Sequence, residues 1–194
     1  MTSIFEKATA EAIETLQALR TIQPALERAA EMAGNCVLGG GKLLVCGNGG
    51  SAADGADFAT EFACRFIHDR RPYPAINLTG CGSLGTAIGN DYGFEQLFAR
   101  QVRGFGRPGD LLVALSTSGN SANVIAAFHE ARQMGIESIA LLGRAGGKAR
   151  GLATIDLIVP GNATARIQEG HKFLLHVLCE IVEQRLQVAE GRTA

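Results

Sequence analysis

The stretch 111–122, LLVALSTSGNSA, constrains the fold of this chain more than any other part of it. An unbroken apolar run from Leu111 to Leu115 ends abruptly at a hydroxyl-rich segment, and apolar residues at helical spacing begin again at Val124. This pattern predicts a buried strand, a short loop and the N-terminus of a helix. Free backbone N–H groups and the positive end of a helix dipole favour an anion there. The anion that such a hydroxyl-rich loop suits is a phosphate monoester.

A second turn of the same design lies earlier in the chain. Residues Lys42 to Cys46 are typical of a strand, the segment GNGGS follows at 47–51, and a helix is expected from about Ala52. Glycines let the backbone approach a ligand closely, and Ser51 is a plausible N-cap. Either loop alone is equally well explained as a tight turn before a capped helix. Two of them in one small protein favour phosphate binding, although neither has the spacing of a dinucleotide fingerprint or a Walker loop.

Apolar strands alternate with amphipathic helices along the rest of the chain. This alternation predicts an α/β fold in which helices cover both faces of a five-stranded parallel sheet. Two further helices are expected within 3–39, with Pro24 in the first turn of the second. The expected strands are Lys42–Cys46, Ala75–Leu78, Leu111–Leu115, Ser138–Leu142 and Thr154–Val159. The expected later helices are Ala52–His68, Gly82–Gly89, Gly93–Arg103, Ser121–Met134 and Ala165–Leu186.

Composition narrows the class of protein. The chain has 194 residues, 46% of them hydrophobic and 19% charged, which suits one globular domain spanning 1–194. A net charge of −1 argues against nucleic acid or an anionic membrane as the main partner. We expect no signal peptide and no membrane span. Five scattered cysteines without a C-x-x-C motif indicate buried thiols in a reducing cytoplasm.

Two expected helices carry polar side chains on otherwise apolar faces. Gln168, Lys172 and His176 follow one another a turn apart near the start of the last helix, and Asp57 and Glu61 share a face of the helix after GNGGS. Solvated acids and a hydrogen-bonded core histidine explain these residues without any function. A carboxylate pair beside the phosphate loops is the alternative that implies chemistry.

Several motifs occur in order and together resemble one family over nearly the whole chain. That family is the sugar isomerase (SIS) domain family, and within it the phosphoheptose isomerases. The matching pieces are CGNGGSAAD at 46–54, TAIGNDYGFEQLFARQV at 86–102, STSGNSANVI at 116–125, Gly146-Gly147, and RIQEGH at 166–171 followed by His176.

The resemblance implies a three-layer α/β sandwich and an aldose–ketose isomerase. It implies conversion of sedoheptulose 7-phosphate to D-glycero-D-manno-heptose 7-phosphate, the entry step to the heptose of bacterial surface polysaccharides such as lipopolysaccharide. It also implies a homotetramer with active sites between subunits, for which the N-terminal helices within 1–39 are expected to provide contacts. The general base maps to Glu61 and the general acid to His176. The substrate and phosphate contacts map to Asn48, Gly49, Gly50, Ser51, Asn90, Asp91, Ser116, Thr117, Ser118, Ser121 and Gln168.

One departure concerns the metal. Zinc-binding relatives use a histidine, the base glutamate, a glutamine and the acid histidine, and the last three map to Glu61, Gln168 and His176. Asp57 stands where the first histidine is expected. Aspartate oxygen can still bind zinc, so we expect a site that is weakened or absent. A second departure, Gly80-Cys81-Gly82, falls in a segment where relatives carry a polar residue and is expected to face the sugar.

The favoured function is therefore isomerisation of a sugar phosphate through an enediolate, with a carboxylate and an imidazole moving the protons. Two alternatives belong to other classes. One is a non-catalytic SIS-domain scaffold that binds the bacterial replication initiator DnaA, for which an altered serine cluster and loss of the histidine at 176 are expected. The other is a sugar-phosphate sensor, which the presence of Asp57 keeps open.

Overall fold

Five parallel strands form the centre of the protein, whose structure is a computed structural model that describes residues 3–191. The strand order is β2-β1-β3-β4-β5, and every neighbouring pair is parallel. The strands are β1 (Leu43–Cys46), β2 (Ala75–Asn77), β3 (Leu111–Ser116), β4 (Glu137–Gly143) and β5 (Ile155–Val159). All five strands predicted from the sequence are confirmed, with ends that differ by one residue at most.

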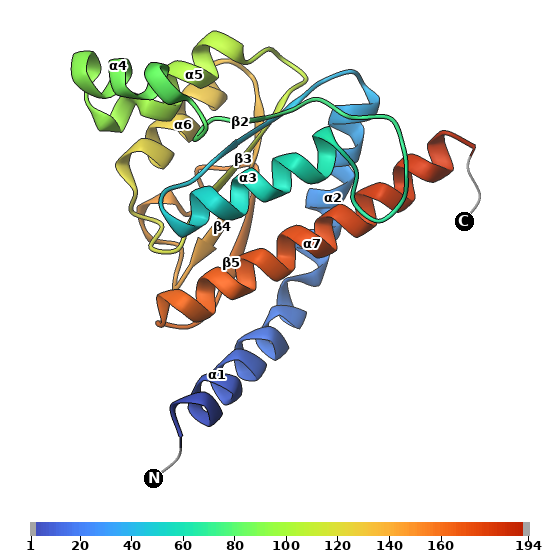
Figure 1. Cartoon of the computed structure of the whole chain (residues 1–194), viewed down its shortest axis with the longest axis vertical. Coiled ribbons are helices and arrows are strands. Elements are labelled where there is room, and N and C mark those ends of the chain that lie inside the picture. Colours follow the sequence, from blue (N-terminus) through green and yellow to red (C-terminus); the bar gives the residue numbers. More distant parts are fainter. Residues whose placement is uncertain (1–2, 192–194) are drawn as a thin grey trace.

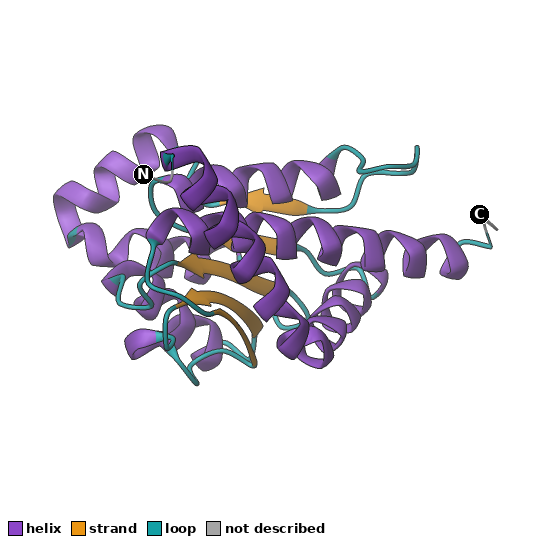
Figure 2. Ribbon diagram, turned by 90° about the horizontal axis from the view of Figure 1, so that it is seen from below, coloured by secondary structure: helices purple, strands orange, loops and turns teal. Residues whose placement is uncertain are grey.

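Helices cover both faces of this sheet and make three layers (Figure 1, Figure 2). One layer contains α2 (Gln23–Leu38), α3 (Gly50–Ala63) and α7 (Thr164–Ala189), and the other contains α4 (Gly82–Tyr92), α5 (Leu97–Phe105) and α6 (Ala122–Gln133). Alternate strand residues point into the two cores, so that Leu43 and Val45 pack with the first layer and Leu44 packs with the second. Because both faces are covered, the strands are continuously apolar rather than alternating.

The first helix, α1 (Ile4–Ala18), projects away from the body of the molecule (Figure 1). A capping box between Ser3 and Glu6 fixes its start, and a 3₁₀ turn leads into α2, where Pro24 occupies the first turn as predicted. No residue of α1 is buried. The helix contacts the rest of the protein through α7, where Arg166 donates to the carbonyl oxygen of Ala8 at 2.7 Å.

Helix α3 ends at Ala63, five residues before the predicted end at His68. The side chain of Arg70 supplies the reason, because it donates to the carbonyls of Phe62 (3.1 Å) and Glu61 (2.5 Å) at the end of the helix. Orphan carbonyls that are satisfied in this way do not need a further helical turn. The following loop is then attached to α7 through Glu183, which accepts hydrogen bonds from the backbone N–H groups of Ile67 and His68.

The chain reverses its direction of winding between β1 and β3. These two strands are neighbours in the sheet, and the helices that follow them, α3 and α6, lie on opposite faces. The carboxyl edge at such a switch point is where ligands bind in open parallel sheets. None of the described helices is long and apolar enough to cross a membrane.

Candidate functional site

The loop after β3 is braced by its own hydroxyls. Ser116 Oγ accepts the Gly119 N–H at 3.1 Å and lies 3.0 Å from Ser121 Oγ, and Ser118 Oγ accepts the Asn120 N–H at 3.1 Å. Gly119 has φ of +64°, and an added Cβ would collide with the backbone of Gly146. The loop therefore has a defined shape that only glycine permits at this position.

A pair of amides joins this loop to the one after β1. Asn48 and Asn123 exchange two hydrogen bonds of 2.8 Å, one in each direction between their side-chain amides. The prediction that Ser51 is the N-cap of α3 is wrong: the cap is Gly49, with φ of +55°, and Ser51 is buried in the first turn. The glycine takes this place because its backbone conformation is one that other residues rarely adopt.

The N-cap residues of both helices, Gly49 and Ser121, make no capping hydrogen bond, and in the first turn of α6 one N–H, that of Val124, is satisfied by a side chain, Asn123 Oδ1 at 3.0 Å. Gly49 has no side chain, and the Ser121 hydroxyl at the start of α6 lies beside Ser116 instead of capping its own helix. First-turn N–H groups that no side chain satisfies are suited to an anion. The two expected phosphate loops thus meet at the switch point, where β1 and β3 end side by side and Asn48 bonds to Asn123.

A row of polar side chains, here called the polar groove, lies along the contact between α3 and α7 and consists of Asp54, Asp57, Gln168, Lys172 and His176. Lys172 Nζ bonds to Asp57 Oδ2 and lies 3.9 Å from Asp54 Oδ1, and His176 Nε2 lies 3.6 Å from the same Asp57 oxygen. The side chain of Gln168 fills the space where a Cβ on Gly50 would lie. The two helices therefore face each other, as contacts between residues far apart in the sequence show.

Opposing effects act on the two aspartates of the groove. The hydrogen bond from Lys172 holds the pKa of Asp57 below its usual range, with His176 adding to the effect. Burial raises the pKa of Asp54, while Lys172 and Gln168 lower it in part. Asp54 Oδ2 is buried without a hydrogen-bond partner. The groove thus holds more carboxylate oxygens than its single ammonium group satisfies.

Glu61 lies one turn beyond Asp57 on α3 and is half-buried. Burial, and after it the negative charge of Glu61, raises the pKa of the Cys179 thiol, which places this carboxylate against α7. His176 precedes Cys179 by one turn on α7, and its ring packs on Phe66 with centroids 5.9 Å apart. The expected base and acid therefore lie on facing helices at the same end of the groove.

The other histidine of the RIQEGH motif has a structural role. His171 is fully buried, and its Nε2 lies 3.0 Å from the carbonyl oxygen of Leu142 in β4. Burial lowers the pKa of His171 to about 4. A neutral imidazole that donates to a strand carbonyl ties α7 to the sheet, and this residue takes no part in the groove.

Two of the expected substrate residues lie away from the loops. Asn90 and Asp91 are exposed near the end of α4, in the opposite layer from α7, and hydrogen-bond to each other at 2.7 Å. Sequence reasoning had assigned no role to Asn123, which ties the two loops together. It ends the STSGNSAN motif, two residues after Ser121, and its position in the first turn of α6 was the available signal.

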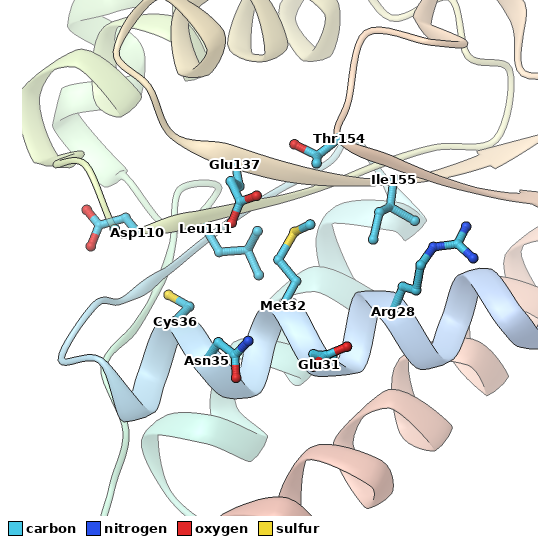
Figure 3. A pocket seen from close by; sticks show the side chains of 11 residues that line it. Arg28, Glu31, Met32, Asn35, Cys36, Asp110, Leu111, Glu137, Thr154 and Ile155 are labelled. Atoms are coloured by element: carbon cyan, nitrogen blue, oxygen red, sulfur yellow. The ribbon is translucent and has the colours of Figure 1, made fainter.

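The cavity in Figure 3, of about 560 Å³, lies elsewhere. It is lined by α2 residues such as Arg28 and Met32 and by Leu111, Glu137 and Ile155, which begin β3, β4 and β5. This is the amino edge of the sheet, opposite the edge at which parallel sheets bind ligands. It is therefore separate from the candidate site.

The four side chains expected to bind zinc do not form a metal site as they are arranged. Within residues 3–191 no group of three or more histidine, cysteine, aspartate or glutamate side chains is placed to hold a metal ion. The Asp57 carboxylate is already bonded to the Lys172 ammonium, so a divalent cation there would lie beside a positive charge. The weakened or absent zinc site stays a prediction, and no chemical step below passes through it.

Comparisons with known proteins agree with the fold. A family model described as the SIS domain matches residues 8–143. The phosphoheptose isomerase of Citrifermentans bemidjiense is 48% identical over 182 residues, which span 94% of each chain. That of Aliarcobacter butzleri is 48% identical over 168 residues, 87% of this chain and 89% of that protein.

Solved structures show the same similarity. The phosphoheptose isomerase from Francisella tularensis has a TM-score of 0.86 and 40% identity, and the match covers 95% of this chain and all of that one. The one from Neisseria gonorrhoeae has a TM-score of 0.86 and 42% identity, with 94% and 100% covered. The chain therefore belongs to the SIS-domain family and, within it, is an isomerase of the phosphoheptose isomerase family.

Proposed function

We propose that this protein interconverts sedoheptulose 7-phosphate and D-glycero-D-manno-heptose 7-phosphate in the cytoplasm. The observation that carries the proposal is the layout of α3. This helix begins without a capping side chain between two hydroxyl- and glycine-rich loops, and two to three turns later it presents Asp57 and Glu61 to the polar side of α7. One helix thus joins the expected phosphate site to the expected base, Glu61, on the side that faces α7 and the expected acid, His176.

The isomerisation moves a proton between C1 and C2 of the sugar through an enediolate. In this proposal the Glu61 carboxylate removes the proton from carbon and returns it to the neighbouring carbon. His176 supplies a proton to the carbonyl oxygen and takes one from the hydroxyl oxygen. Each group is worth about 10²–10⁴-fold in rate when it is correctly placed. The phosphate contacts contribute orientation, because they hold the reacting end of the sugar over the groove.

The expected phosphate contacts are Ser116, Thr117, Ser118 and Ser121 on one side and Asn48, Gly49, Gly50 and Ser51 on the other, with Gln168 at the entrance to the groove. The shared position of the two loops supports this set. Asn90 and Asp91 lie on α4, in the layer opposite α3 and α7. In this proposal they contact the substrate bound to another subunit of the assembled protein.

A homotetramer is part of the proposal. Helix α1 buries none of its residues, and Ile4 and Phe5 are 90% and 79% exposed. Apolar side chains presented so openly are usually covered by another subunit. Light scattering at micromolar concentration is expected to give four chains per particle, and a monomer would contradict this part.

The direct test is incubation with sedoheptulose 7-phosphate in deuterium oxide, followed by NMR and mass spectrometry. We expect an aldose heptose phosphate that has gained deuterium at C2, because an enediolate exchanges its proton with the base. Unphosphorylated sedoheptulose is the matched control and is expected to react far more slowly. Binding of the phosphate without turnover would instead favour the sensor, and absence of both would favour the scaffold.

A further inference from the structure

Lys172 occupies the centre of the groove. Its ammonium group bonds to Asp57, lies 3.9 Å from Asp54, and therefore stands between the two carboxylates of α3. Because His176 lies 3.6 Å from the same Asp57 oxygen, the acid and the ammonium group share one carboxylate. The Lys172 side chain as a whole is 34% exposed.

This arrangement puts a fixed positive charge among the side chains expected to surround a metal. Asp57, Gln168 and His176 all lie around Lys172, on the preceding and following turns of α7 or across from it on α3. An ammonium group and a divalent cation repel each other at such distances in a partly buried site. Lysine is also a compact cation with three donors, enough to hold Asp57 and still donate to a ligand oxygen.

We propose that the ammonium group of Lys172 is a catalytic group of this chain: it excludes a divalent metal from the groove and donates a hydrogen bond to the reacting oxygen of the substrate. The second half of this statement rests on the proposed isomerase function. In the reaction the ammonium group keeps its protons. Its positive charge stabilises the negative charge that forms on the oxygen as Glu61 takes the proton from carbon, and His176 completes the proton balance.

Asp57 then has a role that differs from metal binding. It holds the lysine head group in place between α3 and α7, as a positioning residue. A histidine at the same position would offer a neutral nitrogen, which binds a metal well and an ammonium group poorly. An aspartate at position 57 thus suits a lysine at position 172, and a histidine at position 57 suits a metal ion. Changing both residues together should change the kind of cation that the groove accepts.

The first experiment measures metal and does not depend on activity. The intact protein, Lys172→Met, and the double variant Asp57→His with Lys172→Met are loaded with zinc, desalted and examined by elemental analysis, with calorimetry for affinity. We expect substoichiometric zinc in the intact protein and about one zinc per chain in the double variant. One zinc per chain in the intact protein would overturn the proposal that Lys172 excludes a metal. The same conclusion would follow if circular dichroism shows both variants folded and neither binds zinc.

The second experiment measures turnover of sedoheptulose 7-phosphate. Activity of the intact protein is expected to resist chelators, and Lys172→Met is expected to lose about 10²-fold in kcat, as is typical when one donor to a developing oxyanion is removed. The double variant should regain activity only with added zinc. Unchanged kcat in Lys172→Met, or loss of intact activity on chelation, would overturn the catalytic role.

Arg185→Met is the matched control, because it removes a cation from the same helix whose ion pair with Glu31, 3.7 Å away, lies outside the groove. It is expected to leave both zinc content and turnover unchanged. If the intact protein shows no turnover at all, the proposed function and the catalytic role of Lys172 fail together. The zinc measurements then still decide whether Lys172 excludes a metal.

Discussion

The two halves of the candidate site are held together in different ways. In the loop after β3 the hydroxyl contacts are local, since Ser116 meets a residue five positions away and Ser118 one that is two positions away. The backbone N–H groups of residues 148 and 149 add contacts to Asn120 and Gly119 from about thirty positions away. In the groove the contacts join residues more than a hundred positions apart: Lys172 meets Asp57 across 115 positions, and Glu183 meets Arg70 across 113. The loop therefore depends mostly on its own hydroxyls and on neighbouring backbone, and the groove on the packing of α7 against α3.

This difference separates binding from chemistry. A loop that is braced by its own hydroxyls keeps its shape when a distant helix shifts slightly. Proton-transfer groups on two helices lose their relative position if either helix moves, and small displacements of this kind are costly for catalysis. Changes in the groove should thus act mainly on kcat, and changes in the loops mainly on the binding of the sugar phosphate.

The largest effect is expected for Glu61→Gln. The amide cannot accept a proton from carbon, so kcat should fall by about 10²–10⁴-fold while the Kd for the sugar phosphate changes little. His176→Asn should behave alike. Stopped assays and calorimetry on the same preparations measure the two quantities. Near-normal turnover of Glu61→Gln would show that the base is another residue, and Glu31→Gln, an exposed carboxylate on α2, serves as the control.

Arg70→Met tests whether the groove depends on long-range packing. Arg70 and Glu183 form an ion pair whose side chains are only 5% and 4% exposed, and removing one partner leaves a buried charge. The free energy of unfolding should fall by about 3 kcal/mol, a typical cost for breaking a buried pair. Urea denaturation measures it. If Arg70→Met lowers kcat as well as stability but leaves the Kd for the sugar phosphate unchanged, the groove depends on long-range packing and the loops do not. Equal losses in kcat and in binding would contradict this difference.

His171 should make stability depend on pH. Its pKa is near 4 in the folded protein and 6.5 when unfolded, so between these values the unfolded chain binds the proton and the folded chain does not. The contribution of His171 to the free energy of unfolding is therefore fully present above about pH 7. It is lost as the pH falls toward 4, by about 3 kcal/mol in total.

The measurement is urea denaturation at a series of pH values for the intact protein and for His171→Gln. Glutamine can still donate to the carbonyl of Leu142 but does not titrate, so its stability should depend less steeply on pH in this window. Parallel curves for the two proteins would show that His171 is not the titrating group.

The smallest effect is expected in the loop. Ser118→Ala with Ser121→Ala should weaken binding of the sugar phosphate by about ten- to a hundredfold, or roughly 1–3 kcal/mol, through lost hydrogen bonds to a charged group. Calorimetry provides the Kd. Ser138→Ala, a buried hydroxyl at the amino edge of the sheet, is the control and should alter stability alone. Unchanged affinity in the double variant would reject the phosphate assignment.

Most of the framework could be predicted from the sequence because its signals are local. The run Leu111–Leu115 is buried in β3, and Pro24 lies at the start of α2, as their sequence contexts indicated. The ends of α3 were less predictable. It starts at Gly50, after the N-cap Gly49 with its positive φ, and it ends at Ala63, where Arg70, seven residues further on, donates to the last carbonyls.

By itself, the sequence determined the parallel sheet, its five strands and the two loops at its carboxyl edge, because hydrophobic runs and glycine positions act over a few residues. Only the tertiary structure decided which charged groups meet. Helical spacing placed Lys172 and His176 on one face of α7 and Asp57 on one face of α3, but said nothing of their pairing. That Lys172 bonds to Asp57 follows from how α3 and α7 pack on one face of the sheet, and such packing depends on the whole core.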